Sequence, residues 1–184
     1  MRASLKRGHD ERMKTLLVVA TLLGLGNATA TTLTGKVVKV ADGDTVTVLV
    51  GNEQRRVRLA GIDAPERKQP YGKASGRALR ALVAGKQVRV DYDKRDRYGR
   101  IVGVVWVRAP DMQCASEPCP KTLDAGLYLV TVGLAWWYRR YAREQTLQQR
   151  AAYEKAERQA RTEGAGLWRQ PRPVAPWQWR RQRR

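Results

Sequence analysis

The hydrophobic residues that follow residue 30 fall into short runs rich in β-branched side chains, and turn-forming residues separate these runs. This pattern is typical of β-strands joined by tight turns. In the third run, Val57 and Leu59 alternate with Arg56 and Arg58, so we expect Arg58 to lie outside the apolar core. The predicted strands cover residues 33–40, 45–50, 53–59, 87–92 and 101–107.

Three other segments repeat their hydrophobic residues with the period of an α-helix. They are residues 73–84, a segment marked by Leu127, Val130 and Leu134, and residues 147–163. An order of three strands, one helix, two strands and two helices is that of an oligonucleotide-binding barrel with appended helices. We therefore predict an α+β fold, a five-stranded OB-fold β-barrel with three α-helices, in residues 31–168.

The charge of the chain narrows the choice of partners. The 184 residues include 36 Lys and Arg against 17 Asp and Glu, a formal net charge of +19. Such a charge attracts polyanions but does not determine a fold. Nucleic acid, an anionic membrane surface and an acidic polysaccharide are all compatible partners.

The first residues read as a targeting segment. Basic residues precede an uncharged, largely apolar run at residues 15–25, and Ala28-Thr29-Ala30 offers a cleavage site. We predict a signal peptide in residues 1–30, with translation starting at Met1 or Met13; a buried first helix is the alternative. The remaining chain keeps its basic excess. We expect a periplasmic or extracellular protein without stable membrane insertion after cleavage.

The cysteine and histidine content excludes several chemistries. The two cysteines, Cys114 and Cys119, suit a local disulfide in an exported protein and do not have the spacing of a zinc site. The single histidine, His9, lies in the segment that we expect to be removed. Catalytic triads, histidine-based ribonucleases and zinc hydrolases are therefore excluded. Chemistry must depend on carboxylates, arginines, lysines and tyrosines, with or without a hard metal ion.

Two acidic segments are candidates for that chemistry. Asp42-Gly43-Asp44 precedes the second strand, and Asp63-Ala64-Pro65-Glu66 follows the third. Each is also compatible with an ordinary turn. A cation held by Asp44 and Asp63 would polarise a phosphoryl oxygen, and Glu66 would accept or orient the proton of a water molecule.

Two arginines complete the candidate site. Arg58 lies on the third predicted strand, and Arg100 closes the turn Tyr98-Gly99-Arg100. A guanidinium group presents a planar fork to phosphate oxygens. A solvated turn is the simpler explanation for Arg100 alone, but the carboxylates and arginines together are what phosphodiester hydrolysis requires.

The sequence resembles the thermonuclease (staphylococcal nuclease) family over residues 33–168. The resemblance lies in the order and spacing of three motifs: Asp-Gly-Asp-Thr, Arg-x-x-x-x-Asp-x-Pro-Glu and Tyr-Gly-Arg. The resemblance implies a Ca²⁺-dependent nuclease that cuts DNA and RNA and leaves 3′-phosphate ends. By position it also implies roles for particular residues: calcium ligands at Asp44, Asp63 and the carbonyl of Ala64, phosphate-binding Arg58 and Arg100, catalytic Glu66, and Asp42 near the metal.

Several alternatives remain at this point. A barrel that binds nucleic acid without cutting it, and a cationic envelope-binding protein, are the other functional hypotheses. Tyr138 and Tyr141 are candidates for base or phosphate contact, or for helix packing. Residues 169–184 form a basic Arg/Trp-rich tail that contacts phosphate, contacts the envelope or is solvated. We expect a monomer with DNA and RNA as substrates and no protein partner.

Overall fold

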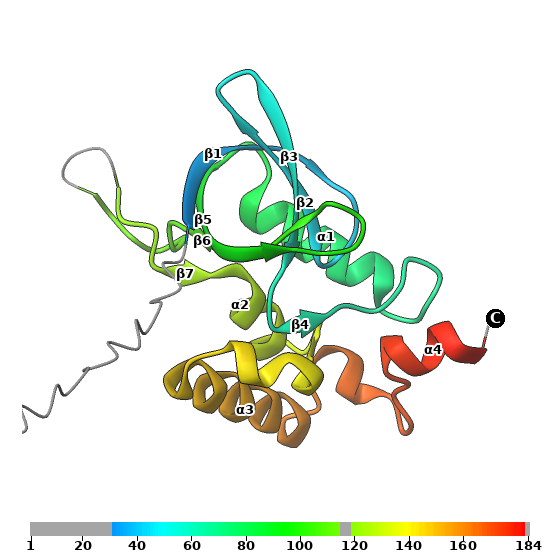
Figure 1. Cartoon of the computed structure of the whole chain (residues 1–184). Helices are drawn as coiled ribbons and strands as arrows, with labels where there is room; N and C mark the ends of the chain where they lie inside the picture. Colours follow the sequence, from blue (N-terminus) through cyan, green and yellow to red (C-terminus); the bar gives the residue numbers. More distant parts are fainter. Residues whose placement is uncertain (1–30, 115–118, 183–184) are drawn as a thin grey trace, which may run out of the picture.

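A computed structural model describes residues 31–114 and 119–182. The predicted signal peptide lies outside these residues. Strands β1, β2, β3, β5 and β6 form an antiparallel sheet in the order β3-β2-β1-β5-β6, and a parallel pairing of β3 with β6 closes it into a barrel (Figure 1). The predicted five-stranded barrel is thus confirmed. Its strands are β1 (Thr31–Val40), β2 (Thr45–Val50), β3 (Glu53–Leu59), β5 (Gln87–Arg95) and β6 (Ile101–Val107).

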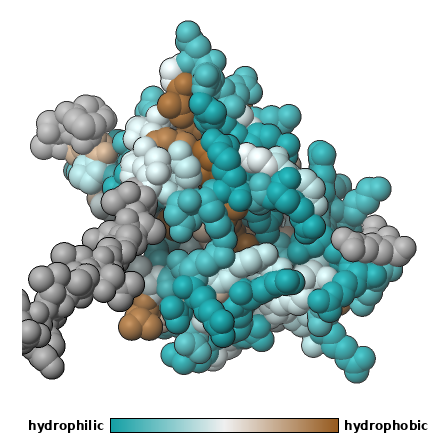
Figure 2. Space-filling model, in the orientation of Figure 1, coloured by the Kyte–Doolittle hydropathy of each residue, from teal (hydrophilic) through white to brown (hydrophobic). Residues whose placement is uncertain are grey.

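Alternating side chains of the strands fill the barrel. Val48, Val57, Val90 and Val105 are fully buried, each on a different strand. The period of two along each strand places every second residue inside and the next one at the surface. On the face drawn in Figure 2, hydrophilic residues cover most of the surface.

In the described part of the chain, four α-helices lie outside the barrel (Figure 1). A buried carboxylate organises two of them, because Asp124 caps α2 through the amides of Gly126 and Leu127 and accepts a hydrogen bond from the Tyr153 hydroxyl on α3 at 2.8 Å. None of the helices in residues 31–114 and 119–182 has the length and apolarity to cross a bilayer. Their bounds are α1 (Gly72–Val83), α2 (Ala125–Thr131), α3 (Leu147–Thr162) and α4 (Pro176–Gln182).

Short elements join the helices to the barrel. Strand β4 (Ile62–Asp63) pairs with β8 (Trp136–Trp137), so that Asp63 lies opposite Trp136. Strand β7 (Leu123–Asp124) extends the edge of β6. The 3₁₀-helices η1 (Arg139–Glu144) and η2 (Gly166–Arg169) flank α3. Cys114 and Cys119 form the local disulfide that their spacing suggested.

The C-terminal segment packs against the domain. Ala175 and Pro176 are buried, and the Gln69 side chain donates a hydrogen bond to the carbonyl of Val174 at 2.6 Å. Trp177 stacks on Tyr138 with ring centroids 5.2 Å apart. The sequence left this segment open between a contact surface and a solvated end. In the structure, α4 covers part of the domain.

Candidate active site

Asp44 enters the site through the turn between β1 and β2. The Asp44 amide donates to the Asp42 carboxylate at 3.1 Å, which shapes the turn. Gly43 has no space for a side chain, because a Cβ there would lie 2.0 Å from the Ser75 hydroxyl on α1. The turn therefore fits closely against α1. Asp44 is 5% exposed and accepts hydrogen bonds from Thr45 and the Ala64 amide.

Arg58 joins the two predicted metal-binding carboxylates. It lies on β3 opposite Thr45 of β2, beside the Asp44 turn. Nη1 of Arg58 lies 2.8 Å from Oδ2 of Asp44, and Nη2 lies 2.8 Å from Oδ1 of Asp63. One guanidinium group therefore bridges both carboxylates. The Arg58 side chain keeps 20% of its surface exposed, as expected for a strand residue that faces away from the barrel interior.

Asp63 and Glu66 follow a sharp change of chain direction. Gly61, with a φ of 75°, adopts a left-handed conformation that favours glycine between β3 and β4. Asp63 is fully buried, whereas the Glu66 side chain is 41% exposed. The Glu66 amide donates to the Gln69 side chain at 3.0 Å. Glu66 is thus the most accessible of the three carboxylates in the site.

Arg100 reaches the site from the turn between β5 and β6. Its Nε and Nη2 bond to the same carboxylate oxygen of Asp96, at 2.7 and 2.6 Å. Arg100 and Arg58 line one pocket of about 420 Å³, together with Tyr98, Tyr138 and Tyr141 and other residues. The structure therefore places the two predicted phosphate-binding arginines on the same cavity, with Asp44 and Asp63 bonded to one of them.

The sequence analysis missed Arg180. This residue of α4 donates from Nη2 to Oδ2 of Asp63 at 2.7 Å, and from Nη1 to Glu66 at 2.7 Å and Oδ1 of Asp63 at 3.2 Å. Its neighbours Trp177 and Trp179 are a partial signal, because large aromatic side chains in a basic tail favour packing. The partner carboxylates were not predictable, because 117 positions separate Arg180 from Asp63.

Burial and neighbouring charges shift the pKa values of ionisable groups in the site. Burial raises the pKa of Asp44, and the nearby Arg58 opposes this shift. Burial alone would lower the pKa of Arg58, but its pairs with Asp44 and Asp63 outweigh burial and raise it. Desolvated carboxylates require positive charge nearby. Arg58 and Arg180 provide that charge here.

The carboxylates have the chemistry of a hard-cation site. Carboxylate and carbonyl oxygens are the ligands that calcium prefers. Asp44 and Asp63 lie close enough to share one guanidinium, and the Ala64 amide is 3.3 Å from Asp44. Residues 31–114 and 119–182 contain no cluster of three or more His, Cys, Asp or Glu side chains suited to a metal. A cation here would thus need backbone or water oxygens besides these two carboxylates.

Comparison with known proteins identifies relatives of this chain. Residues 56–170 match the family described as Staphylococcal nuclease homologue. Protein ParB of Escherichia coli is 41% identical over 150 residues, which are 82% of this chain and 80% of that protein. An uncharacterized endonuclease of Escherichia coli is 40% identical over 146 residues, covering 79% of this chain and 84% of the relative.

A third relative carries an explicit activity in its name. The micrococcal nuclease of Shigella flexneri is 41% identical over 147 residues, which are 80% of each chain. These matches confirm the family resemblance seen in the sequence motifs. The chain belongs to the staphylococcal nuclease homologue family.

Proposed function

We propose that this protein is an exported, calcium-dependent nuclease that hydrolyses phosphodiester bonds of DNA and RNA and leaves 3′-phosphate ends. One observation carries the proposal. Arg58, which bridges Asp44 and Asp63, shares a pocket of about 420 Å³ with Arg100. A pocket with two guanidinium groups beside paired carboxylates suits a phosphodiester, whose charge rises in the transition state.

The arginines would bind the scissile phosphate. Arg58 and Arg100 present planar forks from β3 and from the β5–β6 turn, so they approach the pocket from two elements. Preorganised positive charge of this kind stabilises the pentacoordinate phosphorus more than the ground state. Asp96 holds the Arg100 guanidinium by two bonds, which reduces the cost of orienting it.

Glu66 would accept the proton of the attacking water molecule. Hydrolysis that leaves a 3′-phosphate adds a water oxygen to phosphorus and breaks the bond to the 5′ oxygen. The proton of the water passes to Glu66 and then to solvent, and the departing 5′ oxygen takes up a proton to become a hydroxyl. The Glu66 side chain is 41% exposed, so a water molecule can reach it.

Asp44, Asp63 and the carbonyl of Ala64 would hold the calcium ion. When bound, calcium supplies Lewis acidity toward a phosphoryl oxygen. The two carboxylates already lie within 2.8 Å of one positive group, Arg58. The motif at residues 42–45 therefore acts by fixing Asp44 on the Asp63 side of the barrel.

Export is part of this proposal and rests on the sequence of residues 1–30, with their basic start, apolar run and small residues. A basic protein outside the cytoplasm would meet nucleic acid that has been released from cells. A monomer is sufficient for this function, because one chain supplies every residue of the site.

A binding protein without catalysis is the second candidate. The observation that favours it is the Arg180 guanidinium on Asp63 and Glu66, which would block the carboxylates if it never left them. In that case the protein would bind nucleic acid through its arginines alone. The two candidates differ in whether the acidic residues matter for activity.

Digestion of single-stranded DNA, duplex DNA and RNA by the purified protein tests the proposal, with calcium or with a calcium chelator. We expect degradation only with calcium, and products that a polymerase extends only after phosphatase treatment. An Arg100→Ala variant should lose about 10²–10³-fold in turnover, as for the loss of one transition-state donor. A gel shift without degradation in calcium would favour the binding protein instead.

A further inference from the structure

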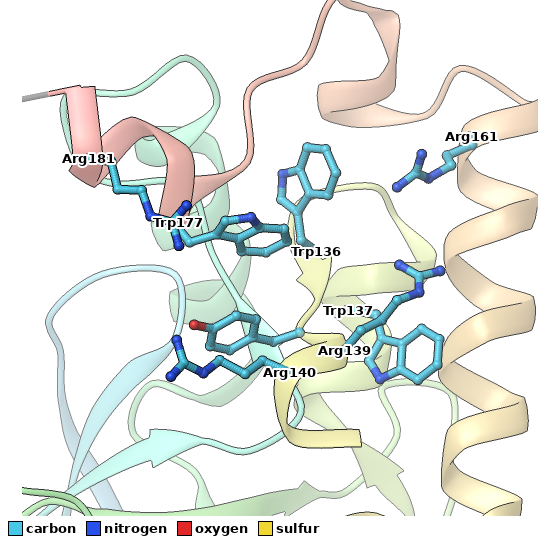
Figure 3. Close-up of a pocket in the computed structure, with 8 residues that line it drawn as sticks. Trp136, Trp137, Arg139, Arg140, Arg161, Trp177 and Arg181 are labelled. Atoms are coloured by element: carbon cyan, nitrogen blue, oxygen red, sulfur yellow. The ribbon is translucent and has the colours of Figure 1, made fainter. Parts of the chain in front are cut away.

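A second pocket shares a lining residue with the one described above. It has a volume of about 360 Å³, and Figure 3 shows rings and guanidinium groups around it. Tyr138 lines both pockets. We call this second cavity the α4 pocket. Its lining residues are Trp136, Trp137, Tyr138, Arg139, Arg140, Arg161, Trp177 and Arg181.

Aromatic rings form one part of the α4 pocket. Trp177 of α4 stacks on Tyr138 with planes 14° apart, and Trp136 meets Trp177 edge to face at 5.6 Å. Such rings are platforms on which unpaired bases stack, whatever their sequence. Trp136 is buried, whereas Trp177 and Tyr138 are partly exposed and are the rings that a nucleobase can reach.

Guanidinium groups form the other part, and they fall into two pairs. Arg139 and Arg161 both bond to the buried Glu157 and stack on tryptophans, so they are held in place. Arg140 and Arg181 are exposed and have no ion pair with any residue that the structure describes. No acidic residue lines the pocket. Arg140 and Arg181 are thus available for phosphate.

The α4 pocket adjoins the proposed catalytic site through two elements. Asp63 on β4 lies opposite Trp136 on β8. On α4, Arg180 contacts the carboxylates of Asp63 and Glu66, while the next residue, Arg181, lines the α4 pocket. A strand bound at Arg58 and Arg100 therefore has this pocket as its neighbour.

We propose that the α4 pocket binds an unpaired nucleotide of the substrate strand next to the scissile phosphate, its base on the aromatic rings and its phosphate at Arg140 and Arg181. This inference rests on the proposed action on nucleic acid and specifies the form of the substrate. A base can stack here only when it is unpaired, so the pocket selects single-stranded DNA or RNA over duplex.

Binding of a labelled single strand and of its duplex, measured with a chelator present to prevent cleavage, tests this proposal. Trp177→Ala should weaken single-strand binding about 5- to 150-fold, the range for loss of one stacking platform. An Arg140→Ala/Arg181→Ala double variant leaves the rings in place. It should weaken single-strand binding. It should also reduce the slope of log K against log salt concentration by about 1.4, as for two lost phosphate contacts.

Arg172→Ala is the matched control, since Arg172 is an exposed arginine of the same segment outside the pocket. The proposal would be overturned if the double variant lost no more binding free energy for the single strand than twice the loss in Arg172→Ala. It would also be overturned if the double variant lost as much affinity for the duplex as for the single strand. Because the assay needs no cleavage, a protein that binds as expected but never cuts would refute the proposed function alone.

A separate observation concerns Arg180 and the cation. Asp63 is fully buried, Arg180 contacts both of its carboxylate oxygens, and Arg58 also contacts Oδ1. A divalent cation on the buried Asp63 carboxylate would lie at close range to the Arg180 guanidinium, and like charges at this range repel. We infer that Arg180 and a divalent cation exclude each other at Asp63.

Exclusion has a measurable consequence. A cation must displace Arg180 to bind. The bonds of Arg180 to Asp63 and Glu66 therefore reduce the apparent affinity of the site for the cation. The family match covers residues 56–170 and does not reach Arg180 in α4, so this competition is a feature of the C-terminal segment.

Calcium binding to the full protein, measured by calorimetry without substrate, tests this second inference. Arg180→Gln should bind calcium about 5- to 150-fold more tightly, a typical coupling between competing sites, while Arg172→Gln should match the wild type. Equal or weaker binding by Arg180→Gln would overturn the inference while leaving the calcium site intact. Absence of binding in every protein would refute the inference and the calcium assignment together.

Discussion

The guanidinium of Arg100 bonds twice to the carboxylate of Asp96, through Nε at 2.7 Å and Nη2 at 2.6 Å. Asp96 also accepts hydrogen bonds from the amides of Tyr98 and Arg100. One side chain therefore shapes the turn and aims the arginine at the pocket. Asp96 is a positioning residue, because it acts on the substrate only through Arg100.

Asp96→Asn tests this role. The amide retains an acceptor for the turn but loses the charge that holds Arg100, so we expect kcat to fall about tenfold with little change in KM. Asp93→Asn, at an exposed position near the end of β5, is the control and should cut normally. Normal kcat in Asp96→Asn would show that Arg100 finds its position without Asp96.

The Asp96 carboxylate should also titrate at unusually low pH. Burial raises its pKa, but the bonds and charge of Arg100 and the bonds from the turn amides together outweigh burial and lower it below 3.8. Because the folded pKa is the lower one, Asp96 stabilises the fold above pH 3.8 and loses this contribution as pH falls through the folded pKa. Carboxyl NMR titration measures this directly. Arg100→Ala should move the pKa upward; an unchanged pKa would contradict the pairing.

Asp44→Asn should alter the response to calcium specifically. Asp44 is a proposed ligand, so we expect the calcium concentration for half-maximal activity to rise at least about tenfold. Binding of single-stranded DNA in chelator should change much less. Magnesium should support little activity in the wild type, because it demands a tighter octahedral shell than this irregular site offers. Equal rates in the two metals would count against the calcium assignment.

The Tyr153 hydroxyl, in contrast, should matter for stability alone. It donates to the buried Asp124 carboxylate at 2.8 Å, and Asp124 caps α2. Tyr153→Phe removes one hydrogen-bond donor from the buried Asp124 carboxylate, so the free energy of unfolding should fall by about 1–3 kcal/mol. The kcat of the folded variant should be unchanged. Denaturant unfolding and cleavage assays separate the two effects, and a large loss of kcat would place Tyr153 in the catalytic path.

Local patterns predicted most of the barrel. The bounds of β2, β3 and β6 coincide with the predicted segments, because alternation and turn residues report strand positions directly. The parallel contact of β3 with β6 was not predicted in detail, since Val57 and Ile101 pair across a long intervening segment. Such closure depends on twist and packing, which no local pattern records.

Some residues of the candidate site were predictable from local sequence motifs, and others were not. The motifs indicated Asp44, Asp63 and Arg58, and the structure places them in one bonded group. Glu157 and Arg180 show what local patterns miss. Glu157 lies in the predicted third helix, yet its side chain is only 1% exposed and pairs with both Arg139 and Arg161. Arg180 comes from a segment whose partners are distant in sequence, so only the fold reveals its contacts.

The most direct test of the central claim is the single-turnover rate at which Glu66→Gln cleaves single-stranded DNA in saturating calcium. Calcium and DNA affinities of the variant are measured alongside. We expect a rate about 10²–10⁴-fold below the wild type, as for loss of a proton acceptor, with DNA affinity preserved to within a few fold and calcium affinity equal or higher, because Glu66→Gln weakens the bond to Arg180. A rate within a few fold of the wild type would contradict the assignment of this site as the catalytic centre.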